Sequence, residues 1–272
     1  MAAPTGLRRT VKVRLNGQVT ATADIVLSIA VAQRDDIESE TMTITVDGNP
    51  VDVQELAAEH GTRLHRIRET PVGQLEVAYD AVVGDDQTMT QLTQGDDITY
   101  QRTSRYCPTD ELGPVAASIF GDATGRDLVD KVVNWVSDHL SYVVGSSGPT
   151  DTAVDTFLRR QGVCRDYAHL TISLLRARGI PARLVSVYAP GLVPMDFHAV
   201  VEAYYDDGWH IVDPTRLAPR DSMVRIATGR DAADTAFITT QTGRFRFGGV
   251  VVNAIVDPVL PREDTTERID LS

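Results

Sequence analysis

The sequence predicts an α+β fold, because strand patterns dominate its first part and helical patterns enter only later. Residues 11–15 and 41–46 alternate apolar and polar side chains, which is the period of a half-buried strand. After residue 124, apolar side chains recur instead at the spacing of one face of a helix. A chain of 272 residues, 42% hydrophobic and 24% charged, is long enough for one large or two modest domains with ordinary cores.

We place a domain boundary near residue 110. Residues 1–110 form a predicted β-rich N-terminal domain with sandwich-like packing, and residues 75–83 contribute a further strand to it. Residues 111–272 form the predicted second domain, a core of helices and strands followed by a β-rich C-terminal segment over residues 224–256. The sequence contains no internal repeat and no low-complexity tract.

Three helices are predicted from their start and stop signals. Thr124 and Thr152 are each followed by an aspartate three residues later, which is the capping pattern of a helix start. Gly162 is expected to end the second of these helices. The third helix begins at or near Cys164 and stops at residues 178–181 (RGIP), where a basic residue, a glycine and a proline follow one another.

Strand patterns return after the third helix. Residues 183–188, 197–205 and 209–212 are rich in β-branched, aromatic and other apolar side chains. The last two segments are separated by residues 206–208 (DDG), a turn signal, so we expect them to pair antiparallel.

Composition excludes several classes of partner. A net charge of −12 argues against a nucleic-acid partner, since phosphate binding needs clustered lysine and arginine. No segment approaches the roughly 18 apolar residues of a membrane helix. The first nine residues carry no apolar stretch of the kind found in a secretory signal. We therefore expect a cytoplasmic protein that binds neither nucleic acid nor membrane.

The number of cysteines also fits the expected cytoplasmic location. Cys107 and Cys164 are the only cysteines, and in the cytoplasm both are expected as reduced thiols, with a disulfide between them as the alternative. Cys107 precedes a proline and is expected to be a buried apolar side chain. The chain has no CxxC or HxxxH spacing, no EF-hand loop and no glycine-rich phosphate loop, so we expect no metal and no cofactor.

Cys164 is the candidate nucleophile. It stands at the predicted first turn of a helix, where unpaired N–H groups and the helix dipole favour an anion, and the thiolate is the reactive form of cysteine. An inert cysteine that opens a core helix is the alternative, and this pattern alone does not separate the two. The backbone N–H of Cys164 would be a natural oxyanion donor, and the second donor is not identified. His169 points away from Cys164 on the helix and is expected to be structural.

His198 and Asp213 are candidates for the same site. Each is more often structural when taken alone, as a histidine in a strand and an aspartate at a turn. A four-residue loop from Tyr205 to Gly208 would make them diagonal neighbours on one face, about 7–8 Å apart at Cα. A two-residue turn at Asp207 and Gly208 would separate them. In the first register the carboxylate can hydrogen-bond the imidazole and leave the other ring nitrogen for a thiol.

Several segments together resemble the core of the transglutaminase-like superfamily. The resemblance spans about residues 115–216, with matching order and spacing. The N-terminal part resembles the first domain of bacterial members. The matching segments are residues 162–170 (GVCRDYAHL), 174–183 (LLRARGIPAR), 198–199 (HA) and 209–215 (WHIVDPT) in the core, and 105–110 (RYCPTD) and 229–234 (GRDAAD) outside it.

The resemblance implies a papain-like core in which a cysteine-bearing helix packs on an antiparallel sheet that carries the histidine and the aspartate. By position it implies Cys164 as nucleophile, His198 as general acid and base, and Asp213 as the carboxylate that orients the histidine. One departure is visible, because many members have tryptophan where Val200 stands. This changes packing near the histidine and removes no catalytic group.

The implied activity is acyl transfer on amide bonds through a thioester. Water as acceptor would make the protein a cysteine peptidase or amidase, which we favour, and an amine acceptor would make it a protein-glutamine transglutaminase. The expected partner is a peptide or protein amide, with an amine in the transferase case. The alternative is a catalytically silent module that keeps the fold and binds a peptide or protein.

Overall fold

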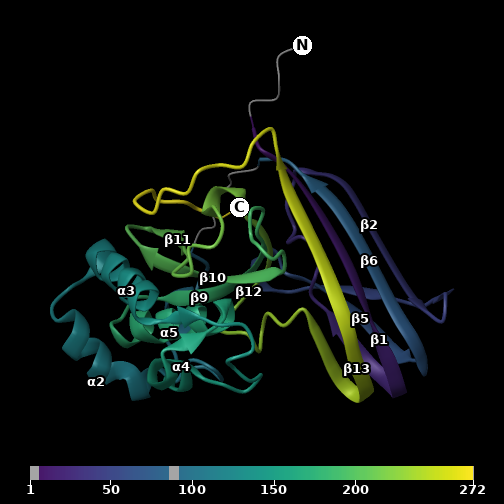
Figure 1. The fold of residues 1–272 in the computed structure, drawn as a ribbon, viewed down its shortest axis with the longest axis horizontal. Coiled ribbons are helices and arrows are strands. Elements are labelled where there is room, and N and C mark those ends of the chain that lie inside the picture. The colour runs from purple at the N-terminus through teal and green to yellow at the C-terminus, as the bar shows by residue number, and fades with distance from the viewer. Residues whose placement is uncertain (1–5, 86–91, 272) are drawn as a thin grey trace, which may run out of the picture.

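In a computed structural model, the described residues form two large sheets and one two-stranded sheet, and helices cover the second of the large sheets (Figure 1). The structure describes residues 6–85 and 92–271, so the first five of the nine N-terminal residues considered above lie outside it. Figure 1 shows the long strands of the first sheet standing on one side and the helical part on the other. Among the described residues, no helix combines the length and the apolar character that crossing a bilayer requires.

The first sheet holds seven strands within the described residues. Six run in the order β3-β2-β6-β1-β5-β4, and β13 pairs with β1. Burial alternates along β1, where Val11, Val13 and Leu15 are buried, as the period-two pattern predicts. The strands are β1 (Arg8–Leu27), β2 (Ile37–Val46), β3 (Asn49–Pro50), β4 (Gln54–Ala57), β5 (Arg63–Thr70), β6 (Gly73–Val83) and β13 (Ile238–Asp257).

Strand β13 comes from the C-terminal segment that the sequence assigned to the second domain. It runs antiparallel to β1 along nearly its full length, from Arg8 opposite Asp257 to Leu27 opposite Ile238. The β-rich character of this segment agrees with the prediction, and its partner strand is in the N-terminal sheet. The proposed boundary near residue 110 stays a prediction.

The second sheet has four antiparallel strands in the described residues, in the order β11-β10-β9-β12. The three strands predicted between residues 183 and 212 are present within one residue of their expected bounds. Its face toward the helices is apolar and packs against α5. The strands are β9 (Ala182–Tyr188), β10 (Phe197–Tyr205), β11 (Gly208–Val212) and β12 (Val224–Gly229).

The β10–β11 hairpin has the register predicted for the longer loop. Val201 lies opposite Val212, and the pairing continues to the ends of the two strands. The turn itself consists of Asp206 and Asp207, with φ angles of 48° and 64°. Both residues are in the left-handed region that two-residue hairpin turns of this kind require, and aspartate tolerates it better than most residues.

The helices gather on the second sheet, with α5 at the centre (Figure 1). Apolar side chains of α2, α3 and α5 form one buried cluster with β9 and β10. Because α5 is covered by both helices and sheet, its residues from Asp166 to Arg176 are all buried. The helices are α1 (Asp96–Thr99), α2 (Thr109–Phe120), α3 (Gly125–His139), α4 (Ala153–Arg159) and α5 (Cys164–Ala177), with short 3₁₀ turns η1 (Glu59–Gly61) and η2 (Arg220–Ser222).

One of the two predicted capping boxes is present, at α4, and the other, at α3, is not. At α4, Thr152 accepts from the Asp155 N–H and the Asp155 carboxylate accepts from the Thr152 N–H, as predicted. At α3 the helix begins directly after Thr124, but the threonine side chain makes no capping hydrogen bond. Gly125 takes a φ of 53°, so the first turn lacks the geometry that a cap requires.

The prediction that Gly162 ends the second helix is wrong. Helix α4 ends at Arg159, and Arg160 closes it in the left-handed region with a φ of 58°. Gly162 lies instead in β8 (Gln161–Gly162), which pairs with β7 (Ser141–Tyr142) in parallel. A Cβ on Gly162 would stand 2.6 Å from Cβ of Asp166, so glycine is needed here for close approach to α5.

Candidate active site

Cys164 is the first residue of α5, as the sequence predicted, and its side chain is partly exposed. The preceding Val163 is extended and caps the helix through its backbone. The buried carboxylate of Asp166 accepts a hydrogen bond of 2.8 Å from the Val163 N–H and another from the Ser147 hydroxyl. Asp166 therefore fixes the turn that presents the thiol at the head of the helix.

His198 and Asp213 meet as the predicted register requires. The His198 ring donates through Nε2 to Oδ2 of Asp213 at 2.8 Å, and both side chains are buried. Asp213 follows the last residue of β11, and His198 is the second residue of β10. The Val200 side chain, two residues further along β10, is fully buried in an apolar cluster.

The second oxygen of Asp213 is held by Thr215, to which the sequence analysis gave no role. Both the backbone N–H and the hydroxyl of Thr215 donate to Oδ1, at 2.9 and 2.7 Å. The Thr215 hydroxyl also lies 3.4 Å from Nε2 of His198. The carboxylate is thus fixed at both oxygens and orients the ring. The segment DPT was noted as a motif, but nothing in it indicates where the threonine points.

Charge at this pair favours a protonated imidazole. Burial lowers the pKa of His198, but the charge and hydrogen bond of Asp213, with a further contribution from Cys164, outweigh it and raise that pKa to about 10. Burial raises the pKa of Asp213, but the charge and hydrogen bond of His198 and the bonds from Thr215 leave it below its usual value. At neutral pH the two therefore form an ion pair.

Since Nε2 is committed to Asp213, Nδ1 is the ring nitrogen left for the thiol. It is a buried nitrogen that has no hydrogen-bond partner among the described residues. Cys164 lies near enough to contribute to the His198 pKa. The ring is therefore tied to Asp213 through Nε2, and Nδ1 is the nitrogen that remains available.

Cys164 and His198 share the wall of one cavity of about 400 Å³. Small and apolar side chains of β9 and β10 line part of it, and charged side chains also contribute to its lining. The residues that line it are Tyr106, Pro149, Cys164, Arg165, Leu184, Ser186, Asp196, Phe197, His198, Ala199, Ala232, Thr235, Ala236 and Phe237. Apolar walls with a few polar groups are the usual lining of a ligand-binding site.

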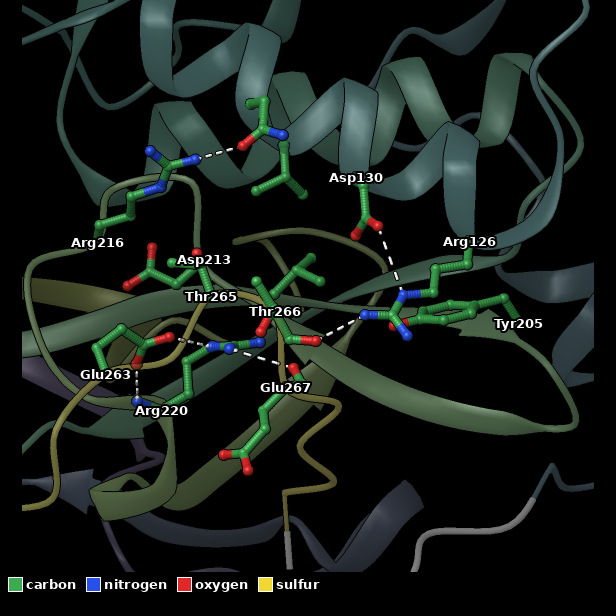
Figure 2. Close-up of a pocket in the computed structure, with 13 residues that line it drawn as sticks. Arg126, Asp130, Tyr205, Asp213, Arg216, Arg220, Glu263, Thr265, Thr266 and Glu267 are labelled. Carbon is green, nitrogen blue, oxygen red and sulfur yellow. Dashed lines mark hydrogen bonds and ion pairs between the residues drawn. The ribbon is translucent and has the colours of Figure 1, made fainter.

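Asp213 does not line this cavity and borders a second one of about 190 Å³ (Figure 2). Figure 2 shows that charged side chains of the core and residues of the C-terminal tail face each other there. Arg220 pairs with Glu263 at 2.7 Å, and Arg126 donates to the backbone oxygen of Thr266. These side chains are engaged with one another, and they hold the tail against the rear of Asp213.

The two other residues considered in the sequence, Cys107 and His169, are structural, as predicted. Cys107 is fully buried and free of a disulfide, and burial raises the pKa of its thiol to about 12. His169 is also buried, which lowers its pKa to about 4. Its ring stacks on Tyr106 and accepts from the Ala232 N–H at 3.1 Å. His169 is therefore a structural residue, which supports two residues of the cavity wall.

Tyr142 is a neighbour of Cys164 that the sequence analysis missed. It is 40% exposed, in the two-residue strand β7. Burial raises the pKa of its hydroxyl, and the neighbouring Cys164 raises it further. A strand of two residues is too short to give a period-two signal, so no pattern in the sequence marks this position.

A cysteine at the head of a buried helix, facing a histidine and an aspartate on an antiparallel sheet, is the arrangement of the transglutaminase-like core. A family model described as the transglutaminase-like superfamily matches residues 115–214. A protein of known structure from Cytophaga hutchinsonii, described as a candidate cysteine protease, is 30% identical, with a TM-score of 0.87 over 98% of each chain. The chain belongs to the transglutaminase-like superfamily. The predicted α+β fold with this core and a strand-rich N-terminal region is confirmed.

Two curated relatives match more limited regions. A protein-glutamine gamma-glutamyltransferase of Pseudomonas aeruginosa is 40% identical over 101 residues, which are 33% of this chain and 14% of that protein. An uncharacterised protein of Mycobacterium leprae is 29% identical over 160 residues, which are 55% of this chain and 56% of that protein. The matched regions therefore span little more than half of one relative and a small part of the other.

Proposed function

We propose that the protein transfers acyl groups from amide bonds through a thioester on Cys164. His198 would act as general acid and base, and Asp213 would hold its ring. The observation that carries this proposal is the shared cavity: Cys164 and His198 line it together, while Nε2 of His198 is fixed by Asp213 at 2.8 Å. Orientation of the base by a third group is the arrangement that activates a thiol nucleophile.

The first half-reaction forms the thioester. The sulfur of Cys164 attacks the carbonyl carbon of the substrate amide, and the carbonyl electron pair moves to oxygen. When that tetrahedral adduct collapses, the C–N bond breaks and Nδ1 of His198 gives its proton to the leaving amine. The raised pKa of His198 keeps this proton in place at neutral pH, and Asp213 stabilises the imidazolium until it is given up.

The second half-reaction releases the acyl group, and the neutral imidazole takes a proton from the attacking nucleophile. We favour water as that nucleophile, because the Cytophaga hutchinsonii relative, which is similar over the whole chain, is described as a candidate cysteine protease. The similarity of the core to a protein-glutamine gamma-glutamyltransferase makes an amine the second candidate acceptor. A peptide or protein amide is the proposed substrate in both cases.

Selective alkylation tests whether the thiol is activated. With limiting iodoacetamide near pH 7, we expect Cys164 to be labelled much faster than Cys107, which is buried and has a raised pKa. His198→Ala should slow labelling of Cys164 strongly, because it removes the imidazolium that stabilises the thiolate. His139→Ala, at an exposed histidine of α3, is the matched control and should leave the rate unchanged. Equal labelling rates in the two histidine variants would overturn the proposal.

Product analysis then identifies the acceptor. Unfolded casein is incubated with the protein and dansylcadaverine, and the products are followed by mass spectrometry and fluorescence. Peptide fragments that disappear with Cys164→Ala support hydrolysis, whereas dansyl incorporation supports amine transfer. Casein that is bound equally well by Cys164→Ala and is never turned over would identify a silent binding module and contradict the proposal.

A further inference from the structure

The tail, residues 258–271, lies along the outer edge of β11. Among the described residues, β11 pairs with β10 on one side only, and its other edge faces the tail. The Ile211 N–H donates to the Ile269 oxygen at 2.8 Å, and Nδ1 of His210 lies 2.6 Å from Oδ1 of Asp270. The tail therefore runs antiparallel to β11 and supports the strand that Asp213 directly follows.

Arg220 fastens the tail to this strand. Its side chain is buried, and Nη1 donates to the Ile211 oxygen at 3.0 Å. The Nε–H and the backbone N–H of Arg220 donate to the two carboxylate oxygens of Glu263, at 2.7 and 2.8 Å. Nη2 donates to the backbone oxygens of Asp264 and Glu267. One guanidinium thus joins β11 to three residues of the tail, a geometry that the single nitrogen of a lysine cannot reproduce.

The other end of the tail is anchored by burial. The Leu271 side chain is 3% exposed and belongs to the apolar cluster that contains Val200 and Ile211. Its backbone oxygen accepts a hydrogen bond of 2.7 Å from Nη2 of Arg225. The tail is therefore held at two points, by Arg220 near residue 263 and by Leu271.

Between these points the tail forms one wall of the pocket that Asp213 borders (Figure 2). Figure 2 shows tail residues on one side of this pocket and Arg126 and Asp130 of α3 on the other. Nη2 of Arg126 donates to the Thr266 oxygen at 2.6 Å and closes the gap between them. If the tail were released, water would reach Asp213 from this side and would weaken its ion pair, because the attraction between charges falls as the dielectric rises.

We propose that Arg220 is a positioning residue for the reaction, because it holds the tail that keeps Asp213 fixed and shielded from water. Arg220 touches neither the substrate cavity nor the reacting groups, and it acts on His198 through β11 and Asp213. No tail residue lines the cavity that Cys164 and His198 share, so the tail should affect the base and leave substrate binding intact. This role rests on the proposed function, which requires an oriented base.

The test uses Arg220→Lys, which keeps the charge and loses the fork. The matched control is Arg268→Lys, the same change in an exposed tail arginine that pairs with Asp206 at the surface. Leu271→Ala is a second variant, which releases the other anchor without a change of charge. Hydrogen exchange at the Ile211 N–H reports whether the tail is loosened. We expect faster exchange in Arg220→Lys and Leu271→Ala and unchanged exchange in Arg268→Lys.

Two further measurements separate positioning from mere stabilisation. In Arg220→Lys and Leu271→Ala, NMR of ¹⁵N-labelled imidazoles should show that His198 titrates at lower pH than in the unchanged protein. The kcat on casein should fall by about 10-fold to 10²-fold with KM little changed, since the base loses its orientation while the substrate cavity stays intact. A residue that only stabilises the fold would lower the melting temperature and leave the titration of His198 in the folded protein unchanged.

The outcomes also distinguish this inference from the proposed function. Unchanged exchange at Ile211 in both variants would overturn the role of the tail, and faster exchange with unchanged His198 titration and kcat would overturn the positioning role. If Arg220→Lys does not fold, Leu271→Ala gives the same readouts. The titration of His198 is measured without substrate, so it tests the tail even if casein is never turned over. Loss of selective alkylation of Cys164 in the unchanged protein would instead contradict the proposed function.

Discussion

His198 takes its charge state from its neighbours. The ring is buried, which by itself disfavours a cation, yet the carboxylate of Asp213 at 2.8 Å reverses the balance. Thr215 in turn holds the other oxygen of that carboxylate. These three residues, which lie within eighteen positions of the chain, therefore set the protonation state of the site before any substrate is bound.

Neutralising Asp213 should lower the pKa of His198. In Asp213→Asn the coulombic contribution is lost and the effect of burial dominates, so the imidazolium should deprotonate at lower pH. We expect the His198 ring to titrate near pH 10 in the unchanged protein and clearly lower in the variant, by NMR of ¹⁵N-labelled imidazoles assigned with His198→Ala. A ring that titrates near 6.5 in the unchanged protein would contradict this prediction.

The same shift makes stability depend on pH. The folded-state pKa of His198 lies above the unfolded value of about 6.5. Its contribution to the free energy of unfolding is therefore fully present below pH 6.5 and is lost as the pH rises toward 10. Urea denaturation of the unchanged protein and of Asp213→Asn at pH 6 and pH 9.5 should show that the difference in stability between them narrows at the higher pH.

Removing the hydroxyl of Thr215 should loosen the carboxylate. Thr215→Val keeps the backbone bond to Asp213 and deletes the 2.7 Å bond from the side chain. A hydrogen bond to a charged group contributes about 1.5–3 kcal/mol, so we expect a loss of that order in urea denaturation. Thr43→Val, on an exposed position of β2, is the control and should change stability by less than about 0.5 kcal/mol. Equal effects in the two variants would contradict the prediction.

At the scale of elements, the head of α5 depends on close contact with β8. Gly162 lies against Asp166, whose carboxylate fixes the turn that presents Cys164. The strand β8 and the first turn of the helix are therefore one unit. Any side chain at Gly162 must push them apart.

Gly162→Ala should destabilise the protein and disturb the thiol. The added Cβ would stand 2.6 Å from Cβ of Asp166, well inside contact distance, so the helix head must shift. We expect a lower melting temperature and slower alkylation of Cys164. Gly113→Ala, in α2 with nothing within 4 Å of the new Cβ, should instead stabilise by about 0.4–1 kcal/mol. A neutral Gly162→Ala would contradict this account of the turn.

The sequence predicts the helices and strands of the core better than it predicts which strands pair with one another. Helix signals place the start of α5 at Cys164, and the hairpin register that brings His198 near Asp213 follows from loop length and strand period. The position of Tyr142 near Cys164 could not be predicted, because β7 is only two residues long. It pairs in parallel with β8, and helix α4 lies between the two strands in the sequence. The pairing of β13 with β1 could not be predicted for another reason. The alternation of apolar and polar residues identifies which face of a strand is buried, but it does not identify the strand that lies beside it.

For the whole molecule, a buried ion cluster lies within the second sheet. Glu202 accepts from Arg183 at 2.7 Å and bonds Arg225, and all three side chains are buried. The cluster joins the neighbouring strands β10, β9 and β12, and Arg183 also contacts His60 of the N-terminal part at 3.2 Å. It thus links the two halves of the structure.

Glu202→Gln should destabilise the whole protein. Burial opposes the charge of Glu202, but Arg183 and Arg225 hold its pKa at about 2, and the amide would remove the buried negative charge that both arginines share. Breaking a buried pair costs about 3–5 kcal/mol, which urea denaturation at pH 7 should detect. The difference should shrink as the pH falls below about 4.5 toward 2, because the stabilisation by a depressed pKa is lost there. Glu76→Gln, on an exposed position of β6, should be neutral.

The pairing of Arg8 with Asp257 has a consequence for biosynthesis. Strand β1 is made before the helical core, and one of its edges stays unpaired until β13 has also been made. The helical core has by then already emerged. The ladder between β1 and β13 can therefore close only after the helical core between them has been made, which gives this sheet a non-local assembly step.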